Sequence, residues 1–129
     1  MVSMNTKKIE TTAGYVVFAH SETPVIYDGQ SALEFAVNIG YGYECRNIAV
    51  NKEALAEDFF ILSTGVAGEV VQKFVNYRCT LAIYGEYARY TSKPLRDFMY
   101  ESNKGAHVFF VETKSEAIEK LANPDRKHF

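Results

Sequence analysis

Stretches of apolar and polar residues predict a chain in which strands and helices follow one another. Near the start, "KKIETT" alternates weakly and "YVVFAH" alternates strongly on either side of Ala13 and Gly14. A period of two on both sides of a glycine turn is typical of a β-hairpin. We therefore expect two antiparallel strands joined by a turn at Ala13 and Gly14.

Further along, short and nearly continuous apolar runs predict buried strands. These runs are "NIAV" at residues 47–50, "TLAIYG", which ends at Gly85, and "HVFFV" at residues 107–111. Near-continuous hydrophobicity is typical of strands that are covered on both faces, as in a parallel sheet. The stretch "NKEALAED", which follows the first of these runs, is interpreted as a loop or a single helical turn.

Helix signals fill the gaps between these strands. Ser31 and Glu34 form an S-x-x-E capping box, which predicts that a helix opens at Ser31. Gly40 or Gly42 is expected to end this helix. The residues predicted to share its core-facing side are Leu33, Ala36, Val37 and Tyr41.

A second, amphipathic helix is predicted from Thr64 onward. Its polar face carries Glu69 and Lys73, and acid and base four residues apart favour an ion pair. The residues predicted on its apolar face are Val66, Val70, Val71, Phe74 and Val75.

Two more helices are predicted in the last third of the chain. Ser92 is expected to cap the first of them, with Pro94 in its first turn and Gly105 at its end. In "TKSE", Thr113 and Glu116 form a capping box for the second. Inward-facing residues are predicted to be Leu95, Phe98 and Met99 in the first, and Ala117, Ile118, Leu121 and Ala122 in the second.

The resulting order of elements is β-β-α-β-α-β-α-β-α, which predicts an α/β fold with a mixed, mostly parallel sheet of about five strands. Helices should pack on this sheet through right-handed crossovers. A chain of 129 residues falls within the size of one domain. We expect that domain to span residues 1–123, where Asn123 and Pro124 end the last helix, with residues 124–129 as a polar tail.

Charge and composition narrow the classes of partner. A formal net charge of −2 gives no general attraction for phosphate backbones. No apolar run reaches the roughly 18 residues of a membrane span, and "MVSMNTKKIE" lacks the apolar core of a signal peptide. Cys45 and Cys79 form no CxxC pair and are predicted to be free thiols, with a single disulfide as the alternative. We expect a cytoplasmic protein that binds neither nucleic acid nor membrane.

The stretch "STGVAGE" at residues 63–69 is the main candidate for chemistry. Gly65 and Gly68 lie where a helix starts, although glycine costs roughly 1 kcal/mol relative to alanine inside a helix. One interpretation is a phosphoacceptor hydroxyl at Thr64 or Ser63, or an anion site built from the amides near Gly65 and Gly68. The alternative is a simple N-cap with small residues for tight helix packing.

Other candidate positions follow from the predicted sheet, because ligands of parallel sheets meet the loops beyond the carboxyl ends of strands. Those loops are residues 51–58 with 63–68, residues 85–92 and residues 112–115. Ser92 therefore joins Gly65 and Gly68 as a candidate anion- or ligand-binding residue. Phosphate-cradling motifs of the types GxxxxGK[ST] and strand-linked GxGxxG are absent from the sequence.

A stripe of polar side chains on the third predicted helix suggests a protein interface. Arg96, Tyr100 and Asn103 are spaced four and three residues apart and so share one face. Arg and Tyr are enriched at interfaces. The alternative is an ordinary helix surface with an intrahelical cation–aromatic contact. Together with Glu69 and Lys73, these three residues form the predicted interaction surface.

Enzymatic chemistry has little support in the sequence. The three histidines have no spacing that suggests a triad or a metal site, and the cysteines lack metal-like partners. We expect no catalytic residue, no cofactor and no metal. A separate hypothesis is an enzyme that uses Glu69, Arg96 or Asp97 as acid, base or anchor. Five acidic residues belong to no recognisable motif and are interpreted as solvated surface residues: Asp58, Glu69, Glu86, Asp97 and Glu101.

Three blocks carry a family resemblance. "DFFILSTGVAGEVVQKFVNYR", "LAIYGEYARYTSKPLRDFMYESNKG" and "FFVETKSEAIEKL", which together cover about Phe59 to Leu121, resemble a bacterial family, the domain of unknown function family DUF4180. The order of elements is in turn similar to the STAS domain, the fold of anti-sigma-factor antagonists. In those antagonists a partner kinase phosphorylates a hydroxyl residue that precedes Gly at a helix start.

The STAS resemblance implies that Thr64 is the phosphoacceptor, because it stands directly before Gly65, with Ser63 as the next choice. The chain departs from the antagonists at Ile61 and Leu62, where an acidic residue usually precedes the hydroxyl. The resemblance implies a non-enzymatic, STAS-like regulatory or protein-interaction domain, switched by phosphorylation. The alternative is a domain that binds a small anionic molecule or nucleotide at the same helix start. Homodimer formation is compatible with the high aromatic content.

Overall fold

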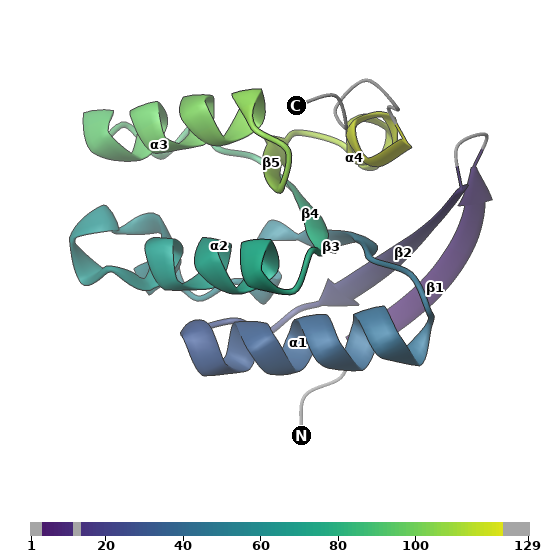
Figure 1. The fold of residues 1–129 in the computed structure, drawn as a ribbon. Helices are drawn as coiled ribbons and strands as arrows, with labels where there is room; N and C mark the ends of the chain where they lie inside the picture. The colour runs from purple at the N-terminus through teal and green to yellow at the C-terminus, as the bar shows by residue number, and fades with distance from the viewer. Residues whose placement is uncertain (1–3, 12–13, 123–129) are drawn as a thin grey trace.

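The computed structural model describes residues 4–11 and 14–122 and shows five strands, four α-helices and three short 3₁₀ turns (Figure 1). The strands are β1 (Met4–Thr11), β2 (Gly14–Ser21), β3 (Asn47–Asn51), β4 (Thr80–Tyr84) and β5 (Val108–Val111). The α-helices are α1 (Gly29–Gly42), α2 (Val66–Asn76), α3 (Lys93–Lys104) and α4 (Lys114–Ala122). The 3₁₀ turns, all between β3 and α2, are η1 (Lys52–Ala54), η2 (Glu57–Phe60) and η3 (Leu62–Thr64).

The strands form one sheet in the order β1-β2-β3-β4-β5. β1 pairs antiparallel with β2 from Met4↔Ser21 to Thr11↔Gly14, and β2 to β5 are parallel. The predicted order of elements and the mostly parallel sheet are therefore confirmed. The hairpin is present as well, whereas the predicted turn residue Ala13 lies outside the described residues.

Three helices cover one face of this sheet (Figure 1). A right-handed crossover between neighbouring parallel strands always returns on the same side, so α1, α2 and α3 form one layer. Their largest buried side chains are Phe35 and Ile39 of α1, Phe74 of α2 and Leu95 of α3. These pack with alternate strand residues in one hydrophobic core; the strand members include Val17, Ile48, Val50, Leu81, Ile83 and Phe110.

The opposite face is covered by α4. Ala49 and Ala82 are fully buried in the middle of the sheet, and such short side chains let a helix lie close to the strands. Ala117 and Leu121 of α4 pack into this second cluster with Val16, Phe109 and Val111. The main core therefore lies between the sheet and α1 to α3, and a thinner one lies beneath α4.

The predicted start of the first helix is wrong, because the cap of α1 is Asp28 and not Ser31. The Asp28 carboxylate accepts a hydrogen bond from the Ser31 amide at 2.8 Å, and the Ser31 hydroxyl accepts one from the Asp28 amide at 3.0 Å. Ser31 therefore closes the capping box at the third helical position. Glu34 is exposed and takes no part in this cap.

The predicted inner face of α1 is also wrong apart from Ala36. The buried apolar residues are Ala32, Phe35, Ala36 and Ile39, whereas Tyr41 is 59% exposed. Phe35 makes an edge-to-face contact with Phe74 of α2, with ring centroids 6.5 Å apart. Packing between the two helices therefore selects the face that carries the large Phe35 and Ile39 side chains.

Most other terminal signals are confirmed. Ser92 caps α3 through the Leu95 amide, Gly105 ends that helix, and Thr113 and Glu116 cap each other's backbone at the start of α4. Cys45 and Cys79 are free and buried, as expected. α4 is described to Ala122, and the predicted stop at Asn123 and Pro124 and the polar tail lie outside the described residues.

The Asp28 cap makes folding dependent on pH. Hydrogen bonds from the amide and then the hydroxyl of Ser31 hold the pKa of Asp28 below its ordinary value. Because the pKa of Asp28 is lower in the folded protein, the ionised carboxylate stabilises the fold. This stabilisation is complete above the pKa of an unfolded aspartate, about 3.9, and is lost as the pH falls through the pKa of the folded state. Asp28→Asn keeps the acceptor oxygen but cannot titrate.

We therefore expect the wild-type protein to melt above Asp28→Asn between about pH 7 and about pH 5, and the difference to shrink below about pH 4. Thermal unfolding of both proteins, followed by circular dichroism across this range, measures the difference. A gap that stays constant into acid would contradict an ionised cap.

Candidate functional site

An aromatic cluster fixes the loops at the carboxyl edge of the sheet. Phe60 of η2 stacks on Tyr90 with ring centroids 4.8 Å apart, and it lies 6.3 Å from the ring of Tyr87. Tyr87 in turn packs edge-on against Phe110 of β5 at 6.0 Å. The segment after β3 and the loop after β4 are therefore one packed unit, although about thirty residues separate them in the sequence.

Polar contacts reinforce this unit at its surface. Arg89 forms an ion pair with Glu57, and the Tyr90 hydroxyl donates to the same carboxylate at 3.3 Å. Lys52 lies over the Tyr90 ring, 5.1 Å from its centroid. Gly85 lies so close to Lys52 that a Cβ at position 85 would stand 2.7 Å from the lysine Cβ, so a glycine is required there.

"STGVAGE" forms the junction between η3 and α2. Gly65 has φ = 81°, a left-handed conformation that ends η3 and opens α2, which explains the glycine by backbone geometry. The Thr64 hydroxyl donates toward the carbonyls of Asp58 and Ile61, at 2.7 and 2.8 Å. It also accepts a hydrogen bond from the Val66 amide at 3.2 Å. Thr64 therefore stabilises the turn.

Ser63 differs from Thr64 in its surroundings. It is exposed, and its hydroxyl has no hydrogen bond to any described residue. Ser63 lines a groove of about 540 Å³ between η3 and the start of α3, together with Phe60, Ile61, Leu62, Ser92 and Pro94. The structure thus brings Ser63 and Ser92, both predicted site residues, to one mostly apolar groove, which we call the η3–α3 groove.

The amides at the start of α2 offer little to an anion. The first amides of a helix lack partners within it, and here the Val66 amide donates to Thr64 and the Glu69 amide donates to the Gly65 carbonyl at 3.2 Å. At most the amides of Ala67 and Gly68 are left for an outside acceptor. Gly68 is exposed, and a Cβ added to it would meet nothing within 4 Å.

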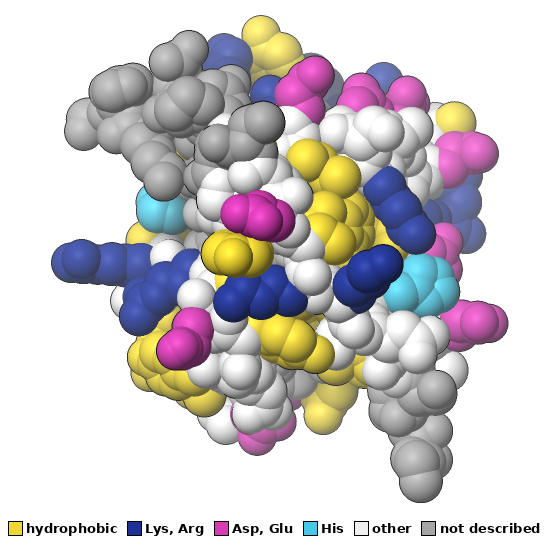
Figure 2. All heavy atoms as spheres, turned by 90° about the vertical axis from the view of Figure 1, so that its right-hand side faces the viewer, with side chains coloured by type: hydrophobic (Ala, Val, Ile, Leu, Met, Phe, Trp, Pro, Cys, Tyr) yellow, Lys and Arg dark blue, Asp and Glu magenta, His cyan; other side chains and the backbone are white. Residues whose placement is uncertain are grey.

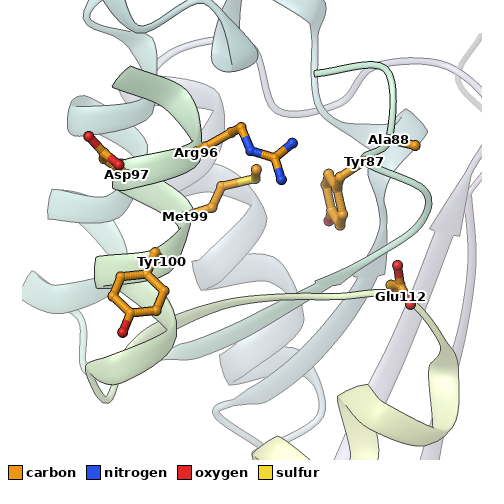
Figure 3. Close-up of a pocket in the computed structure, with 7 residues that line it drawn as sticks. All are labelled: Tyr87, Ala88, Arg96, Asp97, Met99, Tyr100 and Glu112. Atoms are coloured by element: carbon orange, nitrogen blue, oxygen red, sulfur yellow. The ribbon is translucent and has the colours of Figure 1, made fainter. Parts of the chain in front are cut away.

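A second pocket, of about 470 Å³, lies on the other side of α3 (Figure 3). Arg96 and Met99 point from α3 toward Tyr87, and Glu112 lines the far wall, whereas Asp97 and Tyr100 turn away from its centre. The Arg96 guanidinium donates to the Tyr90 carbonyl at 3.1 Å. Arg96 therefore holds the loop after β4 against α3.

Polar side chains that line this second pocket form hydrogen bonds and an ion pair within the chain. Burial, and then the neighbouring Tyr90 and Glu53, raise the pKa of Tyr87 far above its ordinary value, so the phenol remains protonated. Its hydroxyl donates to the Ile83 carbonyl at 2.7 Å. A neutral, engaged phenol is a donor and not a base. Asp97 forms a surface ion pair with Lys93 at 2.6 Å.

The predicted interaction residues differ in the contacts that they make within the chain. Tyr100 is 63% exposed, with the Lys104 ammonium 4.4 Å from its ring centroid. The Asn103 side chain instead pairs with β5, accepting from the Phe110 amide at 2.7 Å and donating to the Phe110 carbonyl at 3.1 Å. The Glu69 carboxylate accepts from the Gly29 amide at 3.2 Å, which joins α2 to the start of α1.

Within residues 4–11 and 14–122, no group of three or more His, Cys, Asp or Glu side chains is placed to hold a metal ion. Among the helices of the same residues, none combines the length and the apolar character needed to cross a bilayer.

The sequence interpretation missed the aromatic residues that build this edge. Phe60, Tyr87 and Tyr90 had no assigned role, because none of them belongs to a periodic pattern of a helix or strand. The one signal available was the density of tyrosine and phenylalanine between residues 59 and 90.

These features define a class: a mixed α/β domain with a single sheet, whose carboxyl edge carries two grooves that flank α3. Residues 11–121 match the family model described as domain of unknown function (DUF4180), and the chain belongs to that family. The predicted resemblance to DUF4180 is therefore confirmed, and the likeness to the STAS domain stays a prediction. No curated protein matches the chain.

The two glycines of "STGVAGE" are expected to respond in opposite ways to alanine. Gly65→Ala places a Cβ in a left-handed conformation and should lower the free energy of unfolding by about 1 to 2 kcal/mol. Gly68→Ala has open space and should raise it by roughly 0.5 to 1 kcal/mol through helix propensity. Urea unfolding of both variants measures this. A destabilised Gly68→Ala would mean that Gly68 has a close neighbour within the chain.

Proposed function

We propose that the chain is a non-enzymatic, STAS-like regulatory or protein-interaction domain that binds a partner protein through the η3–α3 groove. The observation that carries this proposal is the groove itself, which is mostly apolar and lies beside Ile61, a large hydrophobic side chain that is 50% exposed. An apolar centre with a polar rim is the usual composition of an interface core. Ser63 and Ser92 supply the polar rim.

The rigidity of this edge supports a role in recognition. The groove floor is Phe60, which is held by the rings of Phe59, Tyr87 and Tyr90. Binding to a surface that is already fixed costs less conformational entropy than binding that must first order a loop of the domain.

We further propose that phosphorylation of Ser63 switches this association. The resemblance to STAS antagonists favours Thr64, but the Thr64 hydroxyl is engaged by two carbonyls and supports the turn. Both residues are exposed, but only the Ser63 hydroxyl of the pair has no hydrogen bond to a described residue. A phosphate adds a charge of about −1.5 to −2, which would place an ion at the rim of an apolar groove and disfavour a hydrophobic partner.

Protein binding is favoured over an anion site at the same helix start. An anion site requires unengaged amides, and two of the amides near Gly65 already donate within the chain. The η3–α3 groove, by contrast, needs no change of conformation to receive an apolar side chain.

A photo-crosslinker tests the proposed surface in cells of the native host. The chain with p-benzoylphenylalanine in place of Ile61 should form a covalent adduct with one partner protein. The matched control carries the same group in place of Tyr41, a side chain that is 59% exposed at the far end of α1. This control should give no such adduct.

Ser63→Asp in the Ile61 crosslinking background should reduce adduct formation, while Ser63→Ala should preserve it. Intensity of the adduct band, relative to unreacted chain, measures both. No adduct from position 61, or the same adduct from positions 61 and 41, would argue against the η3–α3 groove as the binding surface.

A further inference from the structure

The face of the sheet opposite α1 to α3 carries a second, chemically different groove. It has a volume of about 380 Å³ and lies between α4 and the β1–β2 hairpin. Ile9, Phe18, Tyr84 and Ile118 contribute its apolar part. In Figure 2 hydrophobic side chains gather near the centre of this face, among Lys and Arg side chains. We call this depression the α4 groove.

The topology explains why the α4 groove is open. Five strands spaced about 4.8 Å apart form a sheet close to 20 Å across, whereas one helix is about 10 Å wide. α4 packs over β3 and β4 through Ala49 and Ala82. The inner residues of the hairpin, Ile9 and Phe18, are consequently only partly buried.

The described residues that line the α4 groove carry positive charges and no negative one. Its lining contains the ammonium groups of Lys7 and Lys114 and the imidazole of His20, and none of the described lining residues is acidic. Neither lysine forms an ion pair with a described residue, unlike Lys93. The Lys114 ammonium lies 5.9 Å from the ring centroids of both Phe18 and Tyr84.

The floor adds no opposing charge. Phe18 and Tyr84 meet edge to face at 6.2 Å, and the Tyr84 hydroxyl is buried without a hydrogen-bond partner among the described residues. Burial, and then the negative charge of Glu53, raise the pKa of Tyr84 above its ordinary value, so the phenol is neutral. An anion above these rings therefore meets cations at the rim and neutral aromatic surface below.

We propose that the α4 groove binds a small amphipathic carboxylic acid. Its apolar body lies on Phe18 and Tyr84, and its carboxylate lies between Lys114 and Lys7. Ser115, in the first turn of α4, supplies a neighbouring hydroxyl. The volume is within the range of small-molecule sites. Two ammonium groups without any guanidinium suit a head group with one negative charge better than a phosphate, which is commonly held by arginine forks.

This site is separate from the η3–α3 groove, because the sheet lies between them. The proposal therefore stands or fails independently of the proposed protein partner. A regulatory domain with a ligand on one face and a partner at its edge would be the simplest combination of the two.

Titration of the ¹⁵N-labelled full chain with octanoate tests the α4 groove, with 1-octanol as the neutral control of equal chain length. Saturable amide shifts should appear in β1, β2 and the first turn of α4. Octanoate should bind at least about tenfold more tightly than octanol, as expected for a charge-assisted contact.

Lys114→Gln should weaken octanoate binding about tenfold and leave octanol binding unchanged. The matched control is Lys120→Gln on the same helix, whose ammonium lies 5.5 Å from the Phe109 ring centroid and outside the α4 groove. It should bind octanoate like the wild type. Both lysines lie on the surface of α4, and unchanged amide spectra of the free variants verify folding.

Three results would overturn the proposal. The first is the absence of saturable octanoate shifts in the α4 groove, and the second is equal affinity for octanoate and octanol. The third is a set of groove shifts that follow protein concentration, together with a dimer mass in sedimentation, which would assign the groove to a second copy of the chain.

Discussion

The handedness of the crossovers determines where everything else in this protein lies. Because β2 to β5 are neighbours in chain order, each right-handed connection returns on the same side and places α1, α2 and α3 in one layer. The strand order never reverses, so the sheet lacks the switch point at which nucleotide-binding folds open a crevice. The grooves therefore lie at the carboxyl edge around α3 and on the thinly covered face beside α4.

Local patterns predicted the order of elements because each strand and most caps had an unambiguous signal. The start of α1 is the instructive exception. The sequence pattern predicted a capping box of Ser31 with Glu34, whereas in the structure Asp28 caps the helix and Ser31 closes the box. Contact between Phe35 and Phe74 fixes the rotation of α1 and thereby its first turn. That contact joins residues far apart in the chain, so no window of local sequence contains it.

The candidate site was predictable by region but not by role. Ser63, Thr64 and Asn103 all look like surface polar residues in the sequence. In the structure Thr64 bonds to backbone carbonyls and Asn103 pairs with the edge strand β5, while the Ser63 hydroxyl has no hydrogen bond to a described residue. Whether a polar side chain satisfies the backbone or faces a partner depends on which chain segment lies beside it.

The most direct test of an interaction surface governed by Ser63 is a comparison of two pools of the protein from native cells. Size-exclusion chromatography would separate partner-bound from free chain, and peptide mapping across residues 54–78 would locate any phosphate in each. We expect phosphate on Ser63 in the free pool and its absence from the bound pool. Phosphate on Thr64, equal occupancy of Ser63 in both pools, or two unmodified pools would contradict it.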